Sequence, residues 1–384
     1  ATVAEAFPGP ARNGHAAVWL RGALYSFGGI PDWDSYDSST DEVRCSRGCE
    51  YAHMHRWLPT GARWEAIGNS AEAPRSRHGH TLLPFKSRHV LVVGGHEWGF
   101  GNAQPIHDLC FNLDTAKFTV PALLVNNRFA AASCPAPASP GREAEMEGDR
   151  TRYLLFGGLD EGREPCNDLL RVDLEHNTCE RLAAIGQAPP PQFKGAMALG
   201  PCGRRVVVFD GYTEGASQKV HLLSRAGEGD SFVWRSVCSS AGLVRFAAPV
   251  IMGGRVVATI GGMQRRGSQR RVAAVKYFDL EEMHWVGTSE VRGFAPRTAH
   301  TVISVPAADR ALVNGAKLVS YGGCVEIDAE PNNRGRSVGT LELLHVETPS
   351  LKYFAAIALL RVVPTNEWLP STVASTDDVL DELF

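Results

Sequence analysis

Five arginines recur at matching places in a repeated pattern, each shortly before an apolar segment. They are Arg12, Arg77, Arg128, Arg245 and Arg297, and the fourth repeat instead carries Phe193 with Lys194 beside it. A guanidinium group makes forked, charge-assisted hydrogen bonds that match the geometry of carboxylates and phosphates. If the fold brings these side chains together, they form a group that favours an anionic ligand.

Other residues that could do chemistry form poorer patterns. The pairs His53/His55 and His78/His80 place two imidazoles on one face of a strand, and Cys45 and Cys49 lie close by in CSRGC. No third metal ligand recurs at a defined spacing, and the sequence has no Gly-x-Ser-x-Gly elbow and no phosphate loop. We therefore expect no catalytic residues, no metal and no cofactor.

Composition narrows the function classes. The chain has 384 residues and a net charge of −3, which by itself argues neither for nor against nucleic acid, since no global basic excess supplies a phosphate-binding field. The basic cluster at residues 265–271 is short and lacks interleaved aromatic residues, so we do not expect nucleic acid as a partner. No apolar run reaches the ~18 residues of a membrane span, and the first residues lack the layout of a secretory signal. Nine cysteines, an odd number without a regular framework, indicate reduced thiols and a cytoplasmic protein.

The arginines are spaced by a repeated strand that ends in two small residues. It occurs at Leu24–Gly29, Leu91–Gly95, Tyr153–Gly158, Val206–Gly211, Val257–Gly262 and Leu318–Gly323. The steps are roughly 50 to 65 residues, which is the period of propeller blades lengthened by insertions. The apolar, β-branched composition predicts strands buried between neighbouring sheets, with glycine where the backbone turns tightly.

The chain resembles the kelch-repeat family over roughly residues 7–357. The family's four marks are an Arg-x-Gly-His-like start, the Gly-Gly pair, an aspartate that ends the third strand, and a tryptophan in the fourth. The start is seen in Arg12/His15, Arg77/His80 and Arg297/His300, the aspartates are Asp114, Asp173 and Asp279, and the tryptophans are Trp64, Trp234 and Trp285. Phe118, Cys179 and Tyr353 stand at tryptophan positions, and RFAA replaces the start at Arg128 and Arg245.

This resemblance implies a single six-bladed β-propeller with the arginines in a ring near one mouth of the central channel. The arginines could bind an anionic ligand or brace the loops, and both roles stay open because the family also uses this arginine to brace loops. Two segments compete to close the ring: Val3–Phe7, although the sixth blade already has four expected strands, and Ala358–Val363.

In kelch proteins the loops after the Gly-Gly pairs lie on the same face as that mouth. Here they carry exposed aromatic residues on one side and a basic cluster on the other. The aromatic residues are Trp33, Trp98 and Phe100, and the basic residues are Arg265, Arg266, Arg270 and Arg271. Aromatic anchors and complementary charge suit the docking of a protein partner.

We expect an all-β fold: a six-bladed kelch-like propeller over residues 1–363, with loop insertions, followed by an acidic and apolar tail over residues 364–384. The expected function is a non-enzymatic scaffold or adaptor subunit that docks partner proteins, within a larger complex, on the propeller face. The alternative is an enzyme or sensor for an anionic small molecule, similar to a sialic-acid epimerase, that uses the arginine ring. An acid/base pair beside the arginines would favour the alternative, and none is evident in the sequence.

Overall fold

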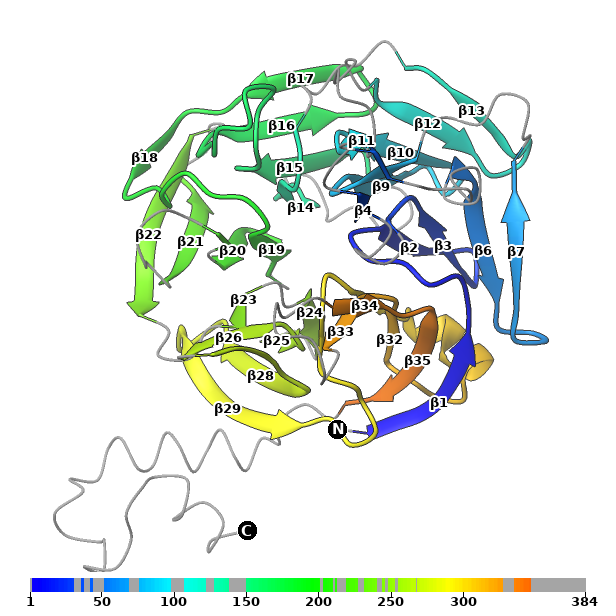
Figure 1. Ribbon diagram of the computed structural model, residues 1–384. Coiled ribbons are helices and arrows are strands. Elements are labelled where there is room, and N and C mark those ends of the chain that lie inside the picture. The colour runs from blue at the N-terminus through cyan, green and yellow to red at the C-terminus, as the bar shows by residue number, and fades with distance from the viewer. Residues whose placement is uncertain are drawn as a thin grey trace, which may run out of the picture. The chain divides into compact units, whose positions relative to one another are not determined.

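The computed structural model is an all-β structure (Figure 1). It describes residues 2–30, 36–37, 42–43, 52–68, 76–97, 107–121, 128–137, 150–200, 203–209, 211–212, 219–226, 231–239, 244–245, 248–252, 255–266, 268–326 and 335–346. Trp33, Trp98, Phe100 and the tail lie outside these residues. Across these ranges no helix is long and apolar enough to cross a membrane.

Six larger sheets recur along the described ranges, and their strands follow one another in the same order. The first strands are β2 (Ala16–Leu20), β9 (Thr81–Phe85), β14 (Ala132–Pro135), β19 (Ala196–Leu199), β24 (Ala248–Met252) and β31 (Thr301–Ser304). The second strands are β3 (Ala23–Phe27), β10 (His89–Val93), β15 (Arg152–Phe156), β20 (Arg205–Phe209), β25 (Val256–Ile260) and β32 (Leu318–Tyr321). The third strands are β6 (Met54–Leu58), β12 (Leu109–Asn112), β16 (Leu169–Asp173), β21 (Lys219–Arg225), β28 (Ala274–Asp279) and β35 (Thr340–His345). The fourth strands are β7 (Arg63–Ile67), β13 (Lys117–Thr119), β17 (Thr178–Arg181), β22 (Phe232–Ser239), β29 (His284–Glu290) and β1 (Thr2–Pro8).

The remaining elements are short. They are β4 (Tyr36–Asp37), β5 (Glu42–Val43), β8 (Arg77–His78), β11 (His96–Glu97), β18 (Ala184–Gly186), β23 (Val244–Arg245), β26 (Met263–Arg266), β27 (Ser268–Arg271), β30 (Arg297–Thr298), β33 (Cys324–Glu326), β34 (Gly335–Ser337) and the 3-10 helix η4 (Ala307–Val313). β18 adds a fifth, parallel strand to the fourth sheet, and the other pairings are antiparallel.

Within residues 2–346 the first strands lie toward the middle and the fourth strands at the outside (Figure 1). Neighbouring first strands contact one another: β2 contacts both β9 and β31, β24 contacts both β19 and β31, and β14 contacts β19. The first and the sixth sheets are therefore neighbours, although the chain between them passes through all the others.

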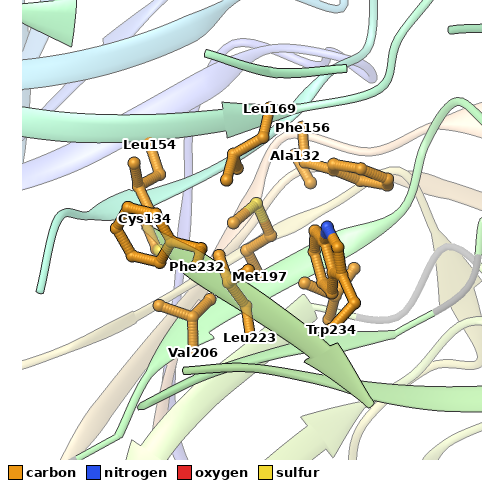
Figure 2. Packing of buried hydrophobic residues seen from close by; sticks show 11 residues of the cluster. Ala132, Cys134, Leu154, Phe156, Leu169, Met197, Val206, Leu223, Phe232 and Trp234 are labelled. Carbon is orange, nitrogen blue, oxygen red and sulfur yellow. The ribbon is translucent and has the colours of Figure 1, made fainter. Parts of the chain in front are cut away.

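Each Gly-Gly segment contains a second strand with a partner on both sides, as the sequence predicts. Both of its faces are buried, because sheets pack against it from either side. Leu154 and Phe156 of β15 pack against the fourth sheet (Figure 2), whereas Tyr153 and Leu155 pack toward the second sheet. This double burial explains why these strands are continuous apolar runs rather than alternating ones.

The sixth sheet takes its outer strand from the start of the chain. β1 pairs with β35 in antiparallel register, with Val3 opposite Leu344 and Phe7 opposite Leu341. The side-chain amide of Asn314 also donates to Glu5 Oε1 at 2.6 Å. The sequence left two segments as candidates for this position. The structure places the amino-terminal one there, and Ala358–Val363 lies outside the described residues.

Backbone hydrogen bonds join the Gly-Gly turns of the first, second, third, fifth and sixth sheets to the arginine turn of the next sheet. The second glycine donates its N–H in the pairs Gly29 to Arg77, Gly95 to Arg128, Gly158 to Gln192, Gly262 to Arg297 and Gly323 to Arg12, at 2.8 to 2.9 Å. At Gly94 the close approach excludes a side chain, since a Cβ there would collide with the Arg128 carbonyl oxygen and φ is +62°. The last pair joins the sixth sheet to the first.

The third strands of the second, third and fifth sheets end in a turn that a side-chain oxygen caps. Asp173 Oδ1 accepts the N–H groups of Glu175 and His176 at 3.0 and 3.1 Å. Asp279 makes the same contacts in the fifth sheet. In the second sheet the cap is Asn112, which accepts from the N–H groups of residues 114 and 115. The assignment of this mark to Asp114 is therefore wrong by two residues.

Candidate functional site

The repeated arginines are buried where the structure describes their side chains. The exposed fractions of Arg12, Arg77, Arg128 and Arg297 are 0%, 3%, 8% and 2%. Three of them donate to the first glycine carbonyl of their own Gly-Gly turn: Arg12 to Gly28 at 3.0 Å, Arg77 to Gly94 at 3.2 Å and Arg297 to Gly322 at 3.2 Å. These arginines hold the turn that docks on the next sheet. The side chain of Arg245 lies outside the described residues.

The second partner of each guanidinium differs from sheet to sheet. Arg297 forms a buried ion pair with Glu342 at 2.7 Å, and Arg128 forms one with Asp168. Burial raises the pKa of Glu342 and lowers that of Arg297. In the first sheet the partner is His55 Nδ1, 3.2 Å from Arg12 Nη2. Burial, together with the Arg12 charge, lowers the pKa of His55 to about 3, so this imidazole is neutral at pH 7.

The fourth sheet has a glutamine in the arginine position. Gln192 O accepts the Gly158 N–H at 2.8 Å, as Arg128 O accepts the Gly95 N–H one sheet earlier. Gln192 is 1% exposed, and its Oε1 accepts the N–H of Gly211 at 2.5 Å. The assignment of Phe193 to this position is therefore wrong by one residue. The sequence pattern does not identify Gln192 as the equivalent of the arginines, because its side chain is neutral and the nearby Lys194 is basic.

A second chain of hydrogen bonds joins the turns two residues after the arginine position. Gly14 N–H donates to Ala299 O, Gly79 to Gly14, Ala130 to Gly79 and Lys194 to Ala130, at 2.7 to 3.1 Å. All five residues have left-handed backbone, with φ between 53° and 64°. Lys194 is the only one of these five to carry a side chain longer than a methyl group.

The Lys194 side chain is reached by solvent although protein atoms surround it. The residue is exposed, yet burial lowers the pKa of its ammonium group. Its charge is among the causes that lower the pKa of His78 to about 3, after burial of that imidazole and the influence of His96. An ammonium group that is exposed and partly desolvated binds an anion more strongly than one in open water.

Aromatic and imidazole rings lie beside this lysine. The ring centroids of His78 and Phe129 are 5.0 Å apart, and His96 lies 5.9 Å from His78 and 6.0 Å from Phe129. Phe193, next to Lys194, lies 5.1 Å from Tyr212, which is 46% exposed. We call these six residues the mouth cluster: His78, His96, Phe129, Phe193, Lys194 and Tyr212. They come from the arginine turns and the turns after the Gly-Gly pairs of the second to fourth sheets.

The basic cluster lies on a hairpin that follows the Gly-Gly pair of the fifth sheet. β26 contains Arg265 and Arg266, and β27 contains Arg270 and Arg271. The side chains of the first three lie outside the described residues. Arg271 is 6% exposed, and its Nη2 lies 3.6 Å from Cys324 Sγ. It is therefore not a charge on the rim.

Among the described side chains, no group of three histidine, cysteine or acidic residues is placed to hold a metal ion. Of the two sequence pairs, His55 is bound to Arg12, and His80 packs against the first glycine turn of the preceding sheet. The sequence does not reveal the mouth cluster, because its members belong to different repeats and Lys194, as a basic residue, resembles the repeated arginines.

The chain resembles parts of several larger proteins. It is 23% identical to acyl-CoA-binding domain-containing protein 5 of Arabidopsis thaliana over 209 residues, which are 53% of this chain and 28% of that protein. It is 27% identical to human Host cell factor 1 over 167 residues, 42% of this chain and 7% of that protein. It is 26% identical to Rho GTPase-activating protein gacHH of Dictyostelium discoideum over 106 residues, 28% of this chain and 6% of that protein. The matches therefore span less than a third of each relative's length, and no family model matches.

Proposed function

We propose that the six sheets are the blades of one closed kelch-type propeller. The hydrogen bonds between Gly-Gly turns and arginine turns support this proposal, since they join the first four sheets in order, the fifth to the sixth and the sixth to the first. The contact of β19 with β24 joins the fourth sheet to the fifth. β1 supports it too, because it supplies the outer strand of the last blade from the beginning of the chain. The similarity to Host cell factor 1 is consistent with a propeller of this type.

We propose further that the protein is a non-enzymatic docking module, a scaffold or adaptor in a larger cytoplasmic complex. The observation that carries this proposal is the mouth cluster. It presents aromatic and imidazole rings and one ammonium group to solvent. The position of Lys194 is occupied by glycine or alanine in the equivalent turns of four other sheets. Partly exposed aromatic side chains beside a cation are typical of the centres of protein interfaces.

The partner would extend from this cluster across the rim of the same face. Trp98 and Phe100 follow the Gly-Gly pair of the second blade, and Arg265, Arg266 and Arg270 follow that of the fifth. Trp33 follows that of the first blade. These positions would add apolar anchors on one side and charge that steers association on the other.

The alternative of an enzyme or sensor for a small anion relied on the arginine ring. The four guanidinium groups that the structure describes are buried in internal contacts, so they support bracing of the turns rather than ligand binding. We therefore place the docking site on the mouth cluster.

Affinity purification from the native source tests the docking face. The bait is the tagged full chain, compared with a Tyr212→Ser variant and with Leu312→Ser as a matched control. Leu312 is similarly exposed at 42% but lies on η4, between the first and second strands and thus on the other face. We expect one set of proteins that the wild type and Leu312→Ser retain and Tyr212→Ser loses. A set lost only with Leu312→Ser would place docking on the other face.

A further inference from the structure

Among the described residues, Arg271 is a buried charge without a carboxylate partner. Its exposed fraction is 6%, and its Nε and Nη1 atoms have no hydrogen-bond partner in the described part of the chain. No ion pair to Arg271 occurs there either. An arginine stays protonated in proteins, so an uncompensated guanidinium at such a site is strongly unfavourable. The surroundings should therefore supply an anion.

The atom that faces the guanidinium is a sulfur. Cys324 Sγ lies 3.6 Å from Arg271 Nη2, and Cys324 is itself only 4% exposed. The two residues come from neighbouring sheets: Arg271 ends β27, and Cys324 follows directly on the Gly-Gly pair of the sixth sheet. A cation beside a cysteine stabilises the thiolate, which is the nucleophilic form of the residue.

We propose that Cys324 and Arg271 form a thiolate–guanidinium pair, and that this pair is a site of reversible oxidation by peroxide. The thiolate sulfur attacks one peroxide oxygen, the O–O bond breaks, and hydroxide leaves and is protonated to water. The sulfur is thereby oxidised to a sulfenic acid and the peroxide is reduced. The low exposure of Cys324 limits the reaction to small oxidants.

The Arg271 nitrogens without a partner among the described residues could stabilise the oxidised form of Cys324. A sulfenate or sulfinate oxygen can accept hydrogen bonds from the Nε–H and Nη1–H groups of Arg271, which have no acceptor among the described residues. The pair also lies close to the seam between the fifth and sixth sheets, since the Gly262 N–H donates to Arg297 O and Cys324 pairs with Thr298, the residue after Arg297. Oxidation would therefore change packing at the edge of the proposed docking face.

Cysteine trapping on the full chain tests the proposal. Hydrogen peroxide is the oxidant, dimedone traps sulfenic acid, and mass spectrometry identifies the labelled cysteine. The matched control within the chain is Cys134, which is buried to a similar degree at 5% and whose pKa burial raises. We expect labelling at Cys324 and not at Cys134, and a rate at least about tenfold lower in Arg271→Gln.

Alkylation by iodoacetamide as a function of pH gives a second readout on the wild type alone. The native protein should reach half-maximal labelling of Cys324 at lower pH than the same protein in urea, where an ordinary thiol titrates near 8.5. Arg271→Lys, which keeps the charge, should retain part of this difference. Equal rates in wild type and Arg271→Gln, or native labelling that follows the urea profile, would overturn the proposal. Stabilisation of the wild type by phosphate, absent in Arg271→Gln and with Cys324 inert, would assign the site to a bound anion instead.

Discussion

The buried pair of Arg297 and Glu342 gives the sharpest test of what the repeated arginines do. Their side chains are 2% and 5% exposed, and the two charged atoms lie 2.7 Å apart. Arg297→Met removes the cation and leaves the carboxylate buried. Breaking such a pair from one side costs about 3 to 5 kcal/mol in the free energy of unfolding. A surface arginine that only binds ligands would cost far less.

The pH dependence of the free energy of unfolding follows from the Glu342 carboxylate. Burial raises the pKa of Glu342 above its ordinary value, so the folded state holds the proton more tightly than the unfolded chain. Stability from this group is therefore present at low pH and is lost as the pH rises through the raised folded pKa. Without Arg297 the pKa rises further, so the variant should regain up to about 1.4 kcal/mol for each pH unit between 7 and 5.

The assay is urea unfolding followed by tryptophan fluorescence at pH 7 and pH 5. The double variant Arg297→Met/Glu342→Gln should recover much of the loss at pH 7, because it removes the unpaired charge. Arg21→Met is the control, since Arg21 pairs with Asp114 at the surface and should change stability little. If Arg297→Met unfolds like the wild type, or if the double variant is no more stable than the single one, the bracing role is refuted.

Three further predictions concern the fold and the docking face. Val207→Asp should destabilise the protein by roughly several kcal/mol in a thermal or urea melt, because Val207 is 0% exposed between two sheets; an unchanged melt would contradict that placement. Deletion of residues 1–8 should lower the melting temperature and produce higher oligomers in size-exclusion chromatography, because the edge of β35 loses its partner strand; a stable monomer would show that β1 does not close the sheet. Trp98→Ala should speed dissociation of a co-purified partner, and reversal of Arg265, Arg266 and Arg270 should slow association at low salt, both measured by surface plasmon resonance; unchanged kinetics in both variants would place the interface elsewhere.

The second strands were predictable from the sequence for a physical reason. A strand buried on both faces must be apolar at every position, and this leaves a run such as Val206–Phe209 that needs no tertiary information to recognise. The glycines after it are equally visible, since the next sheet's backbone leaves no room for a side chain at Gly94. The period of the fold follows from these two features.

The candidate site was much less predictable, because its chemistry depends on partners from other repeats. The Arg297 guanidinium is neutralised by Glu342, 45 residues later, and nothing local to either residue indicates that pair. Gln192 occupies an arginine position and Asn112 an aspartate position, and both side chains are neutral. A pattern that is aligned by charge therefore assigns these two positions to the wrong residues. The exposure of Lys194 and Tyr212 likewise depends on turns from separate sheets.

Amide hydrogen exchange of the full chain with a bound partner tests the docking proposal most directly. The partner is the protein that co-purifies with the wild type and is lost with Tyr212→Ser. Our account predicts slower exchange on binding at residues 193–195 and at residues 211–212, with η4 unchanged. Slower exchange confined to η4 and the outer strands, with the mouth cluster unaffected, would contradict it.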